Sequence, residues 1–137
     1  MSLYYADTSA VLKLLAEEAH SEAFAAFYDS HGNAEWVSSA LLRIEVTRAV
    51  IRAAPALLPD ARDLLGAFSC LTIDDEIVEA AANEPDRALR SLHAIHLATA
   101  RVFGPELDAL VTYDGRLAAA ATDAGLVTLS PGTDSEI

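Results

Sequence analysis

The chain of 137 residues has one cysteine, Cys70, and no long apolar run. A single cysteine excludes an internal disulfide, and its place in an apolar stretch favours a small buried hydrophobe. The longest unbroken apolar run covers residues 23–28, far short of the ~20 residues that a membrane-spanning helix needs, so we expect no membrane span. No basic-then-apolar segment opens the sequence, which leads us to expect a cytoplasmic protein.

Basic side chains are scarce as well. Nine Lys and Arg stand against 21 Asp and Glu, which gives a formal net charge of −12. Such a chain repels phosphate at long range and does not fit a generic electrostatic binder of nucleic acid. Contact with nucleic acid would need a metal ion or a local cluster of arginines, whose planar guanidinium bonds two oxygens at once. A basic partner protein would satisfy the same acidic surface.

Apolar residues make up 53% of the chain, and the many alanines favour helix and argue against disorder. The length suits one domain over residues 1–137. Strands are predicted at 3–6, 70–73, 109–112 and 127–129, and a further short strand is predicted to begin at 36–37. Helices are predicted from Asp7 to about 15 and at 20–30, 40–53, 57–68, 77–83, 91–103 and 116–123, with Ser91 as a cap. Strands separated by helices imply an α/β fold with a parallel sheet covered on both faces.

Three acidic residues are candidates for one site. Asp7 and Asp114 each follow a predicted strand at its carboxyl end, where parallel sheets bind ligands. Glu45 lies at the edge of the apolar stripe of a predicted helix and can lean toward the same rim. Converging carboxylates repel unless they are protonated or neutralised, and a hard divalent cation such as Mg²⁺ neutralises them. Such an ion would also bridge an acidic protein to an anionic substrate.

Each acid also has a purely structural interpretation. Asp7 can serve only as the cap of the next helix. Glu45 can pair with Arg48 on the helix surface, a contact worth about 0.2–0.5 kcal/mol. Asp114 can simply make the Asp-Gly turn. The sequence alone leaves these alternatives open.

Four segments, taken together and in order, resemble PIN-domain proteins, in particular the VapC toxins of bacterial VapBC toxin–antitoxin pairs. They are LYYADTSAVLKL (3–14), SALLRIEV (39–46), LRSLHAIHLATA (89–100) and VTYDGRLAAAA (111–121), and residues 125–132 resemble the family's closing strand and turn. The resemblance implies a three-layer α/β/α PIN-like domain with a short central parallel sheet. It also implies a metal-dependent endoribonuclease that uses Mg²⁺ or Mn²⁺, in which metal-bound water attacks an RNA phosphodiester.

The family's acidic ligands carry over to Asp7, Glu45 and Asp114. Small hydroxyl positions beside them match Thr8, Ser9 and Thr112. The resemblance further implies a homodimer and a small VapB-like antitoxin that masks the site. For an RNA-facing basic rim the best candidates flank the acids, with surface ion pairing as the competing interpretation: Arg43, Arg48, Arg52 and Arg116.

The third segment departs from the family, because it carries His93 where an Asp is expected. An imidazole supplies one nitrogen and no negative charge at most working pH values, and it suits Mn²⁺ or Zn²⁺ better than Mg²⁺. The site would then be weaker, retuned to a softer metal or inactive. The alternative function is a PIN-fold module that binds RNA or antitoxin without cutting.

Three further interpretations are disfavoured. His96 lies three residues after His93 on the same side of the helix, but no Cys or third His accompanies the pair, so a dedicated zinc site is disfavoured. His96 resembles a histidine that recurs beside the Asp position in the PIN-domain segment, and the resemblance implies structural support. A phosphatase would need a second acid after Asp7, and none follows. An aromatic stripe is interpreted as core or dimer contact rather than a base-stacking platform, because no basic residues interleave with it: Phe24, Phe27 and Tyr28.

Overall fold

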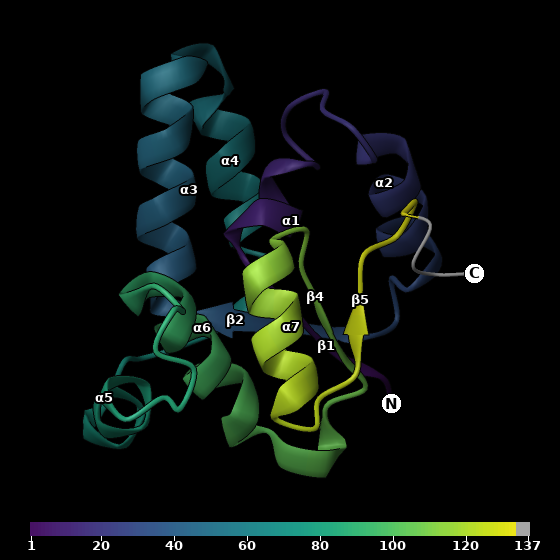
Figure 1. The fold of residues 1–137 in the computed structure, drawn as a ribbon. Coiled ribbons are helices and arrows are strands. Elements are labelled where there is room, and N and C mark those ends of the chain that lie inside the picture. Colours follow the sequence, from purple (N-terminus) through teal and green to yellow (C-terminus); the bar gives the residue numbers. More distant parts are fainter. Residues whose placement is uncertain (134–137) are drawn as a thin grey trace.

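The computed structural model describes residues 1–133, in which a parallel sheet lies between two layers of helices (Figure 1). The strands run in the order β3-β2-β1-β4-β5, and all neighbouring pairs are parallel. Their bounds are β1 Leu3–Ala6, β2 Glu35–Ser39, β3 Ser69–Leu71, β4 Ala109–Val111 and β5 Thr128–Leu129. The predicted three-layer α/β/α architecture is confirmed.

The helices divide between the two faces of the sheet. One face is covered by α1 Thr8–Leu12, α2 Ser21–Ser30, α3 Ala40–Ala53 and α4 Leu58–Leu65, with a 3₁₀ turn at Pro55–Leu57. The other is covered by α6 Ser91–Val102 and α7 Gly115–Asp123, with α5 Asp75–Ala82 packed against α6 and a 3₁₀ turn at Gly104–Glu106. No helix in residues 1–133 is long and apolar enough to cross a membrane.

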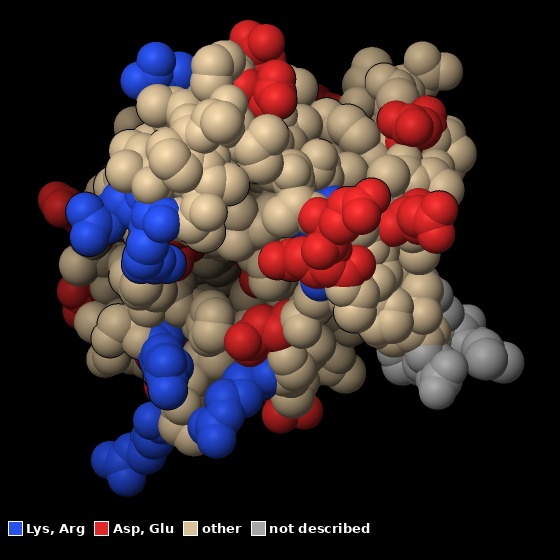
Figure 2. Space-filling view, turned by 90° about the horizontal axis from the view of Figure 1, so that it is seen from above, with Lys and Arg blue, Asp and Glu red and all other residues tan. Residues whose placement is uncertain are grey.

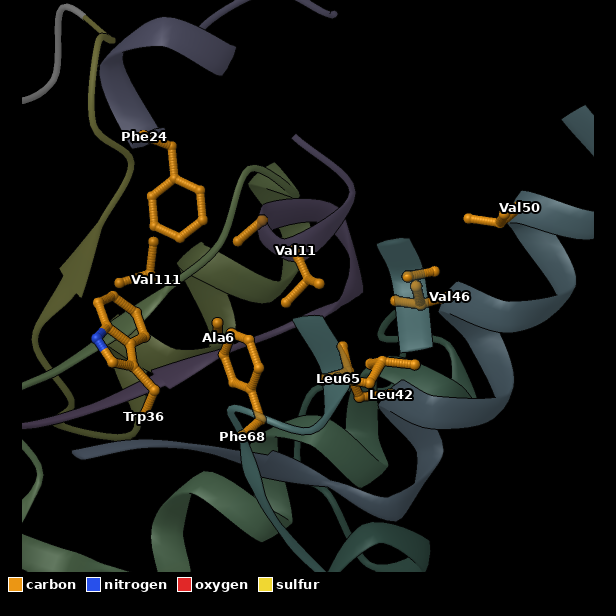
Figure 3. Close-up of a cluster of buried hydrophobic side chains, with 12 residues drawn as sticks. Ala6, Val11, Phe24, Trp36, Leu42, Val46, Val50, Leu65, Phe68 and Val111 are labelled. Atoms are coloured by element: carbon orange, nitrogen blue, oxygen red, sulfur yellow. The ribbon is translucent and has the colours of Figure 1, made fainter. Parts of the chain in front are cut away.

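Side-chain alternation along the strands builds a separate core on each face. Tyr5 pairs with Val37 on one side and Leu110 on the other, and all three side chains pack toward α6 and α7. Ala6 and Trp36 belong to the opposite core (Figure 3). These two clusters hold the central strands on both faces.

The aromatic stripe of α2 belongs to this second core. Phe24 is fully buried, and Phe27 and Tyr28 pack against the same cluster. In Figure 3 the ring of Phe24 lies above Trp36, with Phe68 beside them. The interpretation of the stripe as core rather than a base-stacking platform is therefore confirmed.

The chain order creates a switch point in the middle of the sheet. The chain runs outward from β1 through β2 to β3, then crosses back to place β4 on the other side of β1. Open α/β sheets bind ligands at such a point, beyond the carboxyl ends of the strands. Asp7 directly follows β1, and Asp114 precedes α7 just after β4.

Several local predictions are corrected by the structure. The first helix ends at Leu12 instead of near residue 15, because the chain continues in turns whose amides bond three residues back. Ser91 does not cap its helix; Arg90 occupies the cap position without a side-chain hydrogen bond. Cys70 is half-buried, because β3 is an edge strand.

Candidate active site

Asp7 is the most enclosed of the candidate acids, at 2% exposed. It caps α1, where Oδ1 accepts hydrogen bonds from Ala10 N (3.1 Å) and Ser9 Oγ (2.7 Å). Oδ2 accepts one from Thr112 Oγ1 at 2.7 Å. Burial raises the pKa of this carboxyl, because it outweighs the lowering by His96 and by these hydrogen bonds. The capping interpretation is therefore correct, and it leaves a buried carboxylate at the switch point.

Two hydroxyls lock Asp7 to the segment that follows β4. Thr112 Oγ1 accepts a hydrogen bond from Asp114 N at 3.1 Å while donating to Asp7. Ser9 Oγ accepts one from Tyr113 N at 2.9 Å while donating to the same carboxylate. These small residues tie together the ends of two neighbouring strands, which brings Asp7 and Asp114 to one rim.

Asp114 caps α7 and also faces His93. Its Oδ1 accepts a hydrogen bond from Leu117 N at 2.8 Å. Its Oδ2 lies 3.6 Å from His93 Nε2, with side-chain exposures of 27% for His93 and 31% for Asp114. In the described part of the chain, Nδ1 of His93 is buried without a hydrogen-bond partner. The imidazole thus stands beside the rim carboxylate with one nitrogen unused.

Glu45 reaches the rim from the middle of α3. Its Oε1 accepts hydrogen bonds from Thr8 Oγ1 (2.5 Å) and His96 Nε2 (2.9 Å). Burial alone would raise the pKa of Glu45, but these bonds and the charges of His96 and His93 outweigh it and lower the pKa. Residues 1–133 contain no ion pair between Glu45 and Arg48, so the surface-pair interpretation is wrong.

His96 is held in place by a tyrosine that no sequence pattern had indicated. The ring is 1% exposed, and its Nδ1 lies 2.6 Å from the hydroxyl of Tyr5. A carboxylate can only accept, so Nε2 carries the proton that faces Glu45, while Nδ1 forms its hydrogen bond with the Tyr5 hydroxyl. Burial raises the pKa of Tyr5 well above its usual value, which keeps this hydroxyl protonated. The supporting role favoured for His96 agrees with these contacts.

The four candidate residues surround one rim without forming a compact cage. Among residues 1–133, no three His, Cys, Asp or Glu side chains are grouped closely enough to hold a metal ion. Each carboxylate is satisfied by hydrogen bonds instead. The donors nevertheless fit a hydrated divalent ion, because Mg²⁺ usually keeps several waters and takes only one or two carboxylates. His93 Nε2, which lies 3.6 Å from Asp114 Oδ2, adds a borderline ligand that suits Mn²⁺.

Basic side chains lie to one side of this rim. Figure 2 views the face at the carboxyl ends of the strands, where Lys and Arg gather on one side of a central hollow and Asp and Glu on the other. Arg43 and Arg48 line a hollow of about 860 Å³ between α3 and α4. Arg116 Nη1 donates to the carbonyl of Ala88 at 3.5 Å. No Arg–carboxylate ion pair occurs within residues 1–133. The competing interpretation, that these arginines form surface ion pairs, therefore has no support in that part of the chain.

A PIN domain model matches residues 4–123, and the chain belongs to the PIN-domain family. Ribonuclease VapC35 of Mycobacterium tuberculosis is 42% identical over 132 residues, covering 95% of this chain and 98% of that protein. Ribonuclease VapC46 of the same species is 35% identical over 131 residues, covering 96% and 99%. The resemblance to VapC proteins is therefore confirmed.

Solved structures share the fold. The crystal structure of Mycobacterium tuberculosis VapC20, a sarcin-ricin loop cleaving toxin, superposes with a TM-score of 0.75 at 18% identity, covering 93% of this chain and 99% of that one. A toxin–antitoxin complex from Klebsiella pneumoniae superposes with a TM-score of 0.65 at 18% identity, covering 96% and 98%. At these identities the match establishes the three-layer fold.

Proposed function

We propose that this protein is a metal-dependent endoribonuclease and the toxin of a type II toxin–antitoxin pair. The observation that carries the proposal is the hydroxyl lock through which Thr112 joins Asp7 to Asp114 at the switch point of the sheet. The names of the relatives, which are ribonucleases of the VapC type, support the same reaction class. In this proposal Asp7, Glu45 and Asp114 are the catalytic acids, and His93 occupies the fourth ligand position.

Each residue at the rim has its own role in this proposal. A bound Mg²⁺ or Mn²⁺ supplies an activated water and stabilises negative charge on a phosphate oxygen. Asp7 and Asp114 offer carboxylate oxygens on adjacent strand ends, fixed by Ser9 and Thr112. Glu45 is held ionised and oriented by His96. His93 contributes an imidazole nitrogen, so we expect Mn²⁺ to support more cleavage than Mg²⁺.

The proposed partners follow from charge and from the family. RNA is the substrate, and a VapB-like antitoxin covers the site and inhibits the toxin. A net charge of −12 favours a partner that carries basic side chains toward this surface. Solved structures with this fold include toxin–antitoxin complexes. A homodimer in the cytoplasm completes the proposal.

Cleavage assays with three variants test the function. Structured RNAs are incubated with the wild type, Asp7→Asn, His93→Asp and the control Asp123→Asn, which makes the same change at the exposed far end of α7. We expect Mn²⁺-dependent cleavage by the wild type and the control, none by Asp7→Asn, and a gain of Mg²⁺-dependent cleavage by His93→Asp. If His93→Asp cleaves none of several RNAs with either metal and is not toxic on expression, the nuclease proposal is wrong.

A second candidate function is a PIN-fold module that binds RNA or antitoxin without cutting. His93 in place of an acid favours it, as does the lack of a compact group of metal ligands in residues 1–133. Calorimetric titration with Mn²⁺ separates the two functions. Binding that Asp7→Asn abolishes supports the nuclease, whereas no heat at millimolar Mn²⁺ supports the binding module.

A further inference from the structure

A hollow of about 360 Å³ opens beside Asp114, away from the arginines of α3. Its walls come from the end of α1, the start of α2, the segment joining β4 to α7, and the segment after β5. The volume lies at the lower end of the range that small-molecule sites occupy, about 300–1,000 Å³. The hollow is lined by an ammonium group and two aromatic rings, which belong to Lys13, His20 and Tyr113.

Lys13 is the only lysine of the chain, and it is held in place. Its side chain is 11% exposed, and Nζ lies 3.2 Å from Glu18 Oε1. The ammonium also lies 4.8 Å from the centre of the Tyr113 ring, a cation–π contact. An ammonium has three donor hydrogens, and a single carboxylate oxygen uses one of them. Hydrogen-bonding capacity therefore remains for an anion that enters the hollow.

His20 and Tyr113 also line the hollow. The two rings stack with centroids 5.9 Å apart and planes 9° apart. Tyr113 is fixed from its far end, because its hydroxyl donates to the carbonyl of Pro131 at 2.6 Å. His20 has φ of 69°, the only positive φ outside glycine in residues 1–133. Non-glycine residues rarely adopt this left-handed conformation, so the packing around His20 holds its backbone in a disfavoured state.

We propose that this hollow binds a phosphate group of the RNA strand next to the phosphate that is cut, with Lys13 as its cationic anchor and His20 as a second donor. The proposal rests on the proposed function and adds a substrate-positioning subsite to it. An acidic protein that holds an anionic strand against a rim of carboxylates needs a local positive charge. The chain places its one lysine in a hollow that shares Asp114 with that rim.

The competing explanation is that Lys13 only stabilises the α1–α2 connection through Glu18. Two substitutions separate the explanations, because Lys13→Met and Glu18→Gln break the same ion pair. If the pair is only structural, the two variants affect stability alike and leave RNA binding unchanged. If Lys13 holds phosphate, Lys13→Met weakens binding, while Glu18→Gln removes a competing carboxylate and strengthens it.

The test measures binding without cleavage. A short fluorescent 2′-O-methyl RNA, which a nuclease that needs the 2′-hydroxyl or metal leaves intact, is titrated in EDTA and followed by anisotropy between about 50 and 200 mM KCl. We expect Lys13→Met to lose about tenfold in affinity and Lys13→Arg to retain most of it. The slope of log Kd against log salt should fall by about 0.7 in Lys13→Met, the value for one phosphate contact on a single strand.

The outcomes separate this subsite from the proposed function. Opposite shifts in Lys13→Met and Glu18→Gln, with equal melting temperatures, support the subsite even if no RNA is ever cleaved. Unchanged affinity and salt slope in Lys13→Met overturn it even if the wild type cleaves RNA with Mn²⁺. Absence of any wild-type binding in EDTA also overturns it. If Lys13→Met fails to fold, Glu18→Gln alone decides, and unchanged or weaker binding by that variant counts against the subsite.

Discussion

Replacing Asp7 by asparagine should make the metal-free protein more stable while abolishing its activity. Asp7 is 2% exposed, and burial raises its pKa. A raised folded-state pKa means that the folded state binds this proton more tightly than the unfolded state does. The stability that the group contributes therefore falls as pH rises from the unfolded pKa of about 3.9 through the folded value. At neutral pH the ionised carboxylate opposes folding, and Asp7→Asn removes that cost.

The hydrogen-bond network can accept the amide. In the wild type, Asp7 accepts from Ser9 Oγ, Ala10 N and Thr112 Oγ1. The amide oxygen can keep the first two bonds. The amide nitrogen would face Thr112 Oγ1, which can accept from it and from Asp114 N while turning its own hydrogen toward Ser9 Oγ, 3.3 Å away. No buried polar group loses its partner, so the usual penalty of about 1–3 kcal/mol for an unsatisfied group does not arise.

We expect Asp7→Asn to raise the free energy of unfolding and the melting temperature at pH 7, because burial disfavours the ionised carboxylate that the substitution removes. Thermal and urea unfolding in EDTA between about pH 4 and 8 measures it, and the advantage of the variant should grow with pH. Adding Mn²⁺ should stabilise the wild type by RT ln(1 + [L]/Kd) and leave the variant unchanged.

Two results would refute this reasoning. If Asp7→Asn is less stable than the wild type by 1 kcal/mol or more at pH 7 in EDTA, the hydrogen bonds to the charged carboxylate outweigh its burial. If the stability difference does not change with pH, Asp7 does not titrate in the way the burial argument requires. The control Asp123→Asn removes an exposed carboxylate from the same chain and should change stability little.

Three other predictions concern the supports of the site. Tyr5→Phe leaves Nδ1 of His96 without its hydrogen-bond partner and should cost about 1–3 kcal/mol in urea unfolding; a cost near zero would mean that the 2.6 Å contact contributes nothing. Phe24→Ala should cost about 3–5 kcal/mol in the same assay, because Phe24 is fully buried in the second core. His93→Asp places a carboxylate beside Asp114, so it should destabilise the fold in EDTA and raise Mg²⁺ affinity in calorimetry; unchanged Mg²⁺ affinity would exclude residue 93 from the metal site.

The alternation of strands and helices could be predicted because each element has a local sequence pattern. Short β-prone runs and helical periodicity gave the seven helices of residues 1–133 within a few residues of their observed ends. The bounds of an element were not predicted where tertiary contacts determine them. The strand predicted to begin at 36–37 had no predicted end, and it covers Glu35–Ser39 because both of its edges are paired by neighbouring strands.

The candidate site was predictable only in part, for a physical reason. Asp7 and Asp114 were expected at one rim because parallel strands end on the same edge, and the structure adds the hydroxyl lock between them. The Tyr5–His96–Glu45 chain was not predictable, since it depends on β1 facing α6 while α3 approaches from the other face of the sheet. No spacing of residues along the sequence indicates that these three side chains are in contact. Glu45 was expected at the rim but without its histidine partner.

The rim combines two carboxylates whose environments act in opposite directions. Burial raises the pKa of Asp7, whereas His96 and Thr8 lower the pKa of Glu45. Thr8 follows Asp7 in sequence and donates to Glu45, so the two environments meet within one turn of α1. A pair of titratable groups pushed apart in this way marks a division of roles. The hydrogen bonds to Glu45 already stabilise its ionised form. The ionised form of Asp7 is disfavoured by burial, so a bound divalent cation would stabilise Asp7 more than Glu45.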